Sequence, residues 1–349
     1  MSHITLVLWF ALGVGLVFGV VGQRTGFCLT GGLRDWLLDQ DGRRVRAFAL
    51  ASAVALVGTQ TLEALGYVSL GRSLYLQPSF SWLLLPLGGL LFGYGMVAAN
   101  GCGARSLVLL ASGNLRAFVV LICLAIGAYM VLSGLLAPLR LWLAALSSVA
   151  PPVAPLSLSG WLGQYVGAVP GRWIAVSLVA LPLLAFSLGN ARFRHSPRDW
   201  LGGVLIGGLV PVGWFITGYL GADDFDPVRL VSLTFVAPIG DSVQYVMLST
   251  GTALDFGVTV VAGVLAGSLV AALLSRSFHL QGFDSPQRML RSMAGGLLMG
   301  VGGGLALGCS VGQGLTGMST LGLGSFLAIG GILLGAVLGL RGPLRLPRL

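Results

Sequence analysis

Charge is the property this sequence has least of. Only 9% of its residues are charged, against about 25% in soluble domains, and 56% are hydrophobic. No lysine is present, so all 20 basic residues are arginine, and Glu63 is the only glutamate. Mean hydropathy is +0.92. These values exclude an ordinary soluble domain and indicate an integral membrane protein, with the lipid bilayer as its surroundings.

Cysteine and histidine are also scarce. All four cysteines fall in apolar segments, which argues against the disulfide framework of a small secreted domain. No Cys-x-x-Cys pair is present, and the three histidines lie in loops or at chain ends, away from the thiols. We therefore expect no metal site and no cofactor. The cysteines are Cys28, Cys102, Cys123 and Cys309.

Two further function classes are excluded. The glycine run at 300–308 (GVGGGLALG) follows no strand and lacks the lysine of a phosphate-binding loop, so the chain is not expected to use ATP. A net charge of +9 is compatible with nucleic-acid binding, but most of the arginines lie in short loops between apolar runs. Membrane topology accounts for that placement better. We expect neither an enzyme nor a nucleic-acid partner.

Apolar runs of about 20 residues are long enough to cross a membrane as helices. The first run lacks a basic leader and a small-residue cleavage site, so we expect it to be retained. The segment 137–170 predicts a loop with a short interfacial helix, and 229–250, with Pro238 and Gly240, predicts a re-entrant loop. The fold class is therefore all-α, with about nine transmembrane helices plus short re-entrant or broken helices. The predicted spans are 4–22, 47–65, 82–100, 117–136, 172–189, 200–220, 253–275, 293–307 and 325–340.

The arginines predict an orientation. Fourteen of the 20 lie in four basic segments and at Arg116, on one side of the predicted spans. The loops on the other side hold four, and Arg24 and Arg105 remain at membrane depth. The positive-inside rule then predicts an outer N-terminus and a cytoplasmic C-terminus, in a multi-pass protein of the bacterial inner membrane. The basic segments are 34–46, 192–198, 276–291 and 341–348.

A spacing of 13 residues repeats along the chain. GGLLFGYGMVAANGC (88–102) aligns without a gap on GGLLMGVGGGLALGC (295–309), and each ends in a cysteine 13 residues after its second glycine. Gly15 leads to Cys28 over the same distance. A fourth unit starts at Gly203 and reaches Ile216 instead of a cysteine. The pairs Gly15–Gly19 and Gly89–Gly93 have the spacing typical of close helix packing.

The predicted orientation makes these units an inverted repeat. The first two run from outside to inside, and the last two run from inside to outside. We therefore expect a single transmembrane domain, 1–349, built from halves of about 1–190 and 191–349. Transporters with such repeats bind substrate near the midplane, where interrupted helices meet. The glycines around each cysteine predict an interruption there.

Cys28, Cys102 and Cys309 are the main candidate substrate-binding residues. A thiol is a weak donor and acceptor, which suits a soft sulfur atom better than a hard oxyanion. Arg24 and Arg105, beside two of the thiols, are expected to attract an anion. Asn100 and Gln313 are further candidates, and Cys123, outside the repeat, is expected to be a small buried hydrophobe. Weaker candidates are Gln23, Ser310, Ser319 and Thr217, and Asp241 and Gln244 are expected to be structural or to carry protons.

Together, GGLLFGYG…NGCGARS, GGLLMGVGGG…GCSVGQGLTG and the early GFCLTG (26–31) resemble the YeeE/YedE family of sulfur transport proteins. The resemblance covers essentially the whole chain. It implies an hourglass of inverted repeats that takes up thiosulfate, relayed past cysteines by S–H···S hydrogen bonds, with Cys28, Cys102 and Cys309 at those positions. It also implies a TusA-like cytoplasmic sulfur carrier as a partner. Transport of selenium or another sulfur compound, and a sulfur relay with persulfide on cysteine, remain alternatives.

Overall fold

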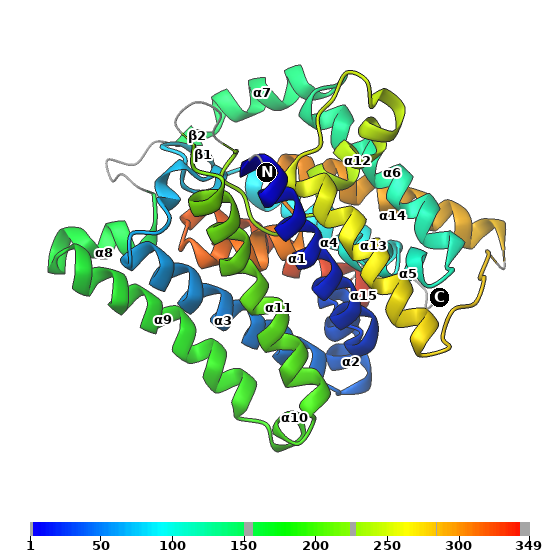
Figure 1. Ribbon diagram of the computed structural model, residues 1–349, viewed down its shortest axis with the longest axis horizontal. Helices are drawn as coiled ribbons and strands as arrows, with labels where there is room; N and C mark the ends of the chain where they lie inside the picture. Colours follow the sequence, from blue (N-terminus) through cyan, green and yellow to red (C-terminus); the bar gives the residue numbers. More distant parts are fainter. Residues whose placement is uncertain (1–2, 150–155, 224–227, 284, 343–349) are drawn as a thin grey trace.

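The computed structural model describes residues 3–149, 156–223, 228–283 and 285–342. Most of the basic C-terminal segment, with Arg345 and Arg348, lies outside these residues, as does part of the loop predicted at 137–170. The described part is a bundle of helices with one small pair of strands (Figure 1).

The elements of the first half are mostly long helices joined by short connections. Strand β1 (Phe80–Ser81) pairs antiparallel with β2 (Ser148–Val149), with Phe80 opposite Val149. Two short 3₁₀ turns precede β1, η1 (Leu70–Arg72) and η2 (Leu74–Leu76). The helices are α1 His3–Thr25, α2 Leu29–Asp39, α3 Arg43–Ala64, α4 Leu84–Ala98, α5 Gly103–Ala111, α6 Leu115–Leu132, α7 Ala137–Leu146, α8 Leu158–Val166 and α9 Ala168–Leu188.

The second half contains the same kinds of element and two π-helical turns. These turns are η3 (Ile216–Leu220) and η4 (Gly312–Gly317). The helices are α10 Ala191–Arg194, α11 Pro197–Phe215, α12 Val236–Leu248, α13 Phe256–Leu274, α14 Pro286–Leu305 and α15 Leu323–Arg341.

Eight helical stretches of the described chain are long and apolar enough to cross a membrane. They correspond to eight of the nine predicted spans, and the chain is an all-α membrane protein as predicted. The ninth span, 293–307, lies in α14, which has 20 residues but begins with polar and arginine-containing turns. Its many glycines pack inside the bundle, so α14 depends less on an apolar surface than its neighbours do.

Two predicted loops contain more helix than the sequence suggested. The segment 137–170 holds two helices, α7 and α8, with β2 between them, where one short helix was predicted. The segment predicted to be re-entrant is an extended stretch followed by α12. Pro238 lies in the first turn of α12, where a missing backbone N–H breaks no helical hydrogen bond.

Each repeat unit packs onto a different helix through the glycine that lies 13 residues before Cys28, Cys102, Ile216 or Cys309. A Cβ atom at any of these four glycines would lie within 3.0 Å of a backbone carbonyl oxygen. Only glycine allows helices this close, because nothing stands between the two backbones. The four contacts are Gly15 on α13, Gly89 on α15, Gly203 on α3 and Gly296 on α6.

These contacts are reciprocal between the halves. Helix α1 packs on α13, which follows the third unit, and the third unit's α11 packs on α3, which follows α1. In the same way α4 packs on α15, and α14 packs on α6. Every unit thus meets the helix that follows its counterpart in the other half. This pattern supports the division into two inverted halves, which we retain as a proposal.

The two ends of the bundle are distinguished by α1. We call the side where α1 begins the N-terminal face and the side where it ends the opposite face. His3 lies 3.4 Å from Asp223 at the N-terminal face, and Gln23 donates a hydrogen bond to Ser277 at the opposite face. In Figure 1 the start of α1 and α7 lie towards the top, whereas α2 and α10 lie at the bottom.

Candidate functional site

A left-handed residue lies two positions before each of the three repeat cysteines. Gly26 has φ +67°, Asn100 has φ +59° and Leu307 has φ +54°. Each of these residues turns the chain sharply, so that the preceding helix stops and a new helical segment starts at the cysteine. The predicted interruptions at Cys28, Cys102 and Cys309 are therefore confirmed.

Each cysteine then begins a helical segment. Cys28 is the N-cap of α2, and Cys102 is the N-cap of α5. The Cys309 sulfur accepts a hydrogen bond of 3.2 Å from the backbone N–H of Gly312, three residues on. Gly31 and Arg105 hold the equivalent N–H groups, which face the other two sulfurs without making a capping hydrogen bond. All three thiols therefore lie at the positive ends of helix dipoles.

The three thiols are buried in the bundle. Cys28 and Cys102, from the first two units, lie next to each other, and their side chains interact. Cys309 lies beyond them towards the N-terminal face, where its side chain interacts with that of Thr234. Thr234 and the Tyr75 hydroxyl both lie against Gly312, which brings η2 close to the thiol. Neither Thr234 nor Tyr75 was predicted, because both lie in connecting segments outside the repeat.

The two arginines predicted beside the thiols differ in placement. Arg105 is half-buried next to the thiol pair, and its Nη1 donates a hydrogen bond of 3.1 Å to the carbonyl oxygen of Gly22. Arg24 is exposed in the last turn of α1, and its carbonyl oxygen accepts a hydrogen bond from Arg198. The structure brings Arg105 to the thiols and leaves the Arg24 side chain outside the buried site.

The predicted amides are also separated. Gln313 is buried in η4, where its Nε2 donates to the carbonyl oxygen of Ala306 and its Oε1 has no hydrogen-bond partner. Gln313 also lines a cavity of about 210 Å³ towards the N-terminal face. Asn100 is exposed, and its Oδ1 accepts a hydrogen bond of 2.7 Å from Arg34. Of the two amides, only Gln313 is buried with an open acceptor.

The weaker candidates are mostly engaged in structural contacts. Thr217 and Ser319 donate hydrogen bonds to the carbonyl oxygens of Val231 and Thr316. Ser310 is buried beside Cys309, and its hydroxyl has no partner among the described residues. Asp241 and Gln244 both meet the Tyr129 hydroxyl. This shared contact fits the structural role predicted for them.

The fourth unit differs at the position that matches the cysteines. Ile216 continues from α11 into the π-helical η3 without an interruption, and its side chain is buried. Cys123, outside the repeat, lies half-buried in α6. Among the described residues, no group of three histidines, cysteines or carboxylates is arranged to hold a metal ion.

A larger cavity approaches the site from the N-terminal face. It has a volume of about 470 Å³, and its wall includes Arg72, Arg229, Asp241 and Asp255. Thr234, whose side chain interacts with Cys309, is also part of this wall. A cavity with two arginines and two aspartates in its wall therefore reaches to within one side chain of the first thiol.

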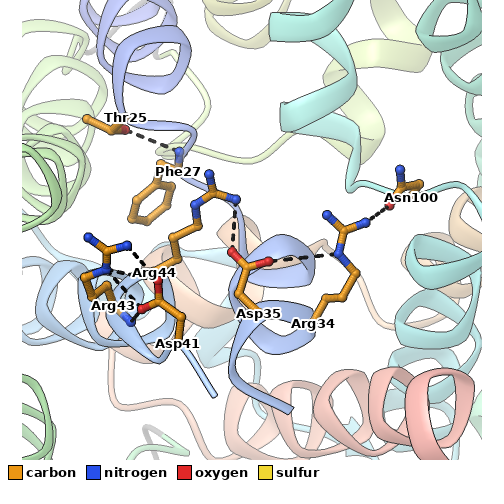
Figure 2. Close-up of polar contacts among 8 residues, drawn as sticks. All are labelled: Thr25, Phe27, Arg34, Asp35, Asp41, Arg43, Arg44 and Asn100. Carbon is orange, nitrogen blue, oxygen red and sulfur yellow. Dashed lines mark hydrogen bonds and ion pairs between the residues drawn. The ribbon is translucent and has the colours of Figure 1, made fainter. Parts of the chain in front are cut away.

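Charged residues lie between the thiol pair and the opposite face. The Asp35 carboxylate lies 3.1 Å from Arg44 Nη1 and 4.0 Å from Arg34 Nε. Figure 2 shows Asp35 between these two arginines and Arg34 reaching Asn100. The contacts tie α2, in the first repeat unit, to the interruption in the second unit. Sequence reasoning had assigned these arginines to membrane topology alone.

Known proteins resemble this chain along most of its length. Residues 24–338 match the family described as "Sulphur transport". The thiosulfate transporter TsuA of Escherichia coli strain K12 is 29% identical over 318 residues, which cover 86% of this chain and 84% of that protein.

Two other curated proteins match as well. The thiosulfate transporter TsuA of Spirochaeta thermophila is 28% identical over 335 residues, 92% of this chain and 94% of its own length. The probable transporter YedE of Escherichia coli is 32% identical over 97 residues, 27% of this chain and 22% of its own. The resemblance noted from the cysteine motifs is therefore confirmed, and the chain belongs to the sulphur transport family, whose members are membrane transporters rather than enzymes.

Proposed function

We propose that this protein carries thiosulfate or a closely related sulfur anion across the membrane, past Cys309 and then the Cys28–Cys102 pair. The observation that carries the proposal is the arrangement of three buried thiols, each at the start of a helical segment and each from a repeat unit. The names of the two TsuA relatives support thiosulfate as the substrate.

The chemistry of the thiols suits this cargo. A neutral thiol costs less free energy to bury than a thiolate does, and it donates a weak hydrogen bond that breaks readily. The terminal sulfur of thiosulfate is a soft acceptor, and helix N-termini favour its negative charge. Arg105 adds a full positive charge beside the pair. The anion thus passes from thiol to thiol without forming a covalent bond.

We also propose an orientation and a partner. The N-terminal face lies outside the cytoplasm and the opposite face inside it, in the inner membrane of a bacterium, because the arginine-rich loops lie on the opposite face. A small TusA-like sulfur carrier receives the sulfur there. Consumption of the anion on arrival keeps its inner concentration low and maintains net uptake.

The test is growth of a bacterium that lacks its own sulfur uptake systems, on thiosulfate as the sole sulfur source. The protein is compared with Cys102→Ala, Cys309→Ala and the matched control Cys123→Ala, which removes a half-buried thiol outside the repeat. We expect growth with the unmodified protein and the control, and none with the other two variants. Immunoblots of membrane fractions check that all four proteins are inserted at equal levels.

Several outcomes would contradict the proposal. Normal growth with Cys102→Ala and Cys309→Ala would remove the thiols from the path. Growth of the unmodified protein on selenium or other sulfur compounds, but not on thiosulfate, would assign a different substrate. Mass spectrometry that finds one added sulfur on a repeat cysteine during transport would replace hydrogen bonding by a covalent persulfide relay.

A further inference from the structure

Arg44 lies against the loop that carries Cys28. A Cβ atom built on Gly26 would lie 3.3 Å from Arg44 Nη2, and one built on Gly31 would lie 3.4 Å from Arg44 Nη1. The Gly31 position is also 3.8 Å from the Cβ of Cys28. The guanidinium therefore spans the two glycines on either side of the thiol, and the missing side chains make room for it.

Arg44 is held in this place by one carboxylate. Asp35, one helical turn beyond Gly31 in α2, pairs with Arg44 at 3.1 Å, and its side chain is only 22% exposed. Phe27 stacks on Phe48 beneath the same loop, which fixes the backbone around Cys28. The Arg44 side chain itself is 42% exposed, so its remaining N–H groups are open to a ligand.

Two guanidinium groups thus flank the thiol pair. Arg105 approaches it from α5 and Arg44 from α3, close enough for the two charges to repel each other. Such repulsion favours an anion bound near both. Arg44 lies on the side of Cys28 nearer the opposite face, where the anion emerges under the proposed function.

The neighbouring Arg43 has the same chemistry in a different place. It pairs with Asp41, two residues earlier, at 2.7 Å, and the two side chains are 48% and 40% exposed. The atoms nearest to a Cβ built on Gly26 or Gly31 include those of Arg44 but none of Arg43. Figure 2 shows the two pairs, Arg43–Asp41 and Arg44–Asp35, in one view. Arg43 is therefore a matched internal control.

We propose that Arg44 receives the anionic oxygens of the sulfur anion as it leaves the Cys28–Cys102 pair, and that Asp35 takes the guanidinium back when the anion departs. The inference rests on the proposed function. Because anion and carboxylate compete for one guanidinium, Asp35 prevents Arg44 from trapping the cargo. Arg44 thereby sets the rate of release as well as the preference for anions over neutral sulfur compounds.

The experiment measures initial rates of ³⁵S-thiosulfate uptake in cells without other sulfur uptake systems. Arg44→Gln is expected to lower uptake at subsaturating thiosulfate about tenfold, the usual effect of losing a charge-assisted hydrogen bond. Arg44→Lys keeps the charge and restores a large part of the rate. Asp35→Asn is expected to lower both KM and Vmax, because the anion is held longer. The controls Arg43→Gln and Asp41→Asn stay within about threefold of the unmodified protein.

The outcomes separate this inference from the function on which it rests. If the unmodified protein takes up no thiosulfate, the proposed function fails and the role of Arg44 fails with it. If it does, and Arg44→Gln equals Arg43→Gln, only the role of Arg44 is overturned. Arg44→Lys as slow as Arg44→Gln at equal membrane levels would assign Arg44 to packing. A raised KM in Asp35→Asn would overturn the competition with the carboxylate.

Discussion

At the scale of single residues, the site depends on three left-handed positions. Gly26 adopts this conformation without a steric penalty, and Asn100 tolerates it because its short polar side chain suits that region. Leu307 has no such advantage, and the left-handed conformation costs it about 1–2 kcal/mol. The surrounding packing holds all three turns, so each thiol stands at the start of its helical segment.

Asn100 allows the backbone requirement to be measured. Asn100→Gly and Asn100→Val both remove the hydrogen bond to Arg34, but only valine clashes in the left-handed conformation. We expect Asn100→Val to be less stable than Asn100→Gly by about 2 kcal/mol. Thermal unfolding of both proteins in detergent, followed by intrinsic fluorescence, checks this difference. Equal stabilities would show that the turn adjusts and that its conformation is not required.

The sequence alone identified the site residues that recur at a regular spacing. The glycines and cysteines repeat 13 residues apart, so the sequence alone indicates that they belong to one site. Arg44 lies 16 residues beyond Cys28 in a basic loop, where membrane orientation is a sufficient explanation for it. Only folding of α2 back onto α3 brings it to Gly26 and Gly31. Arg24, nearer in sequence, is exposed in the last turn of α1.

At the scale of helices, the reciprocal glycine contacts hold the two halves together. Two polypeptide backbones meet there without side chains between them, and dispersion contacts between close-packed backbones replace the hydrophobic effect that lipid cannot supply. The sequence showed the glycine spacing but not which helices pair, since period alone does not identify a partner. It also understated the helix content of 137–170, because proline and serine there mark the helix ends of α7 and α8.

Gly15 and Gly13 provide a matched pair on one helix. A Cβ at Gly15 would meet backbone atoms of α13 within 3.0 Å, whereas one at Gly13 would meet nothing within 4 Å. We expect Gly15→Ala to lower the free energy of unfolding by about 2 kcal/mol and Gly13→Ala to leave it unchanged or slightly raised. Unfolding of the purified proteins in mixed micelles with increasing denaturing detergent measures both. A loss in Gly13→Ala as large as that in Gly15→Ala would contradict the packing assigned to α1.

At the scale of the whole molecule, two arginines, Arg105 and Arg44, lie beside the thiols, and one carboxylate, Asp35, pairs with Arg44 there. Among the described residues, none of the fully buried side chains is an aspartate or a glutamate. Asp241, the carboxylate suspected of carrying protons, lies in the cavity of the N-terminal face and is engaged by Tyr129. Asp35 pairs with Arg44, and Asp241 is engaged by Tyr129, so we expect neither carboxylate to hand a proton to the crossing anion.

This arrangement predicts that transport moves net charge. An inside-negative potential of 100 mV opposes a dianion by about 4.6 kcal/mol, since each charge contributes about 2.3 kcal/mol. In proteoliposomes with potassium gradients and valinomycin, an inside-positive potential should accelerate ³⁵S-thiosulfate uptake and an inside-negative one should slow it. At equilibrium, 100 mV corresponds to a concentration ratio of roughly two-thousandfold.

A pH gradient supplies the opposing test in the same vesicles. With the potential clamped at zero, a proton gradient should leave uptake unchanged, because the thiols pass the anion on without accepting its charge. Accumulation driven by the pH gradient alone, and insensitive to valinomycin, would mean that two protons travel with each dianion. A proton carrier would then have to lie along the path, and Asp241→Asn tests whether Asp241 is that carrier. If it is, the variant loses the response to pH but still exchanges labelled for unlabelled thiosulfate. If Asp241 only contacts Tyr129, the response to pH remains.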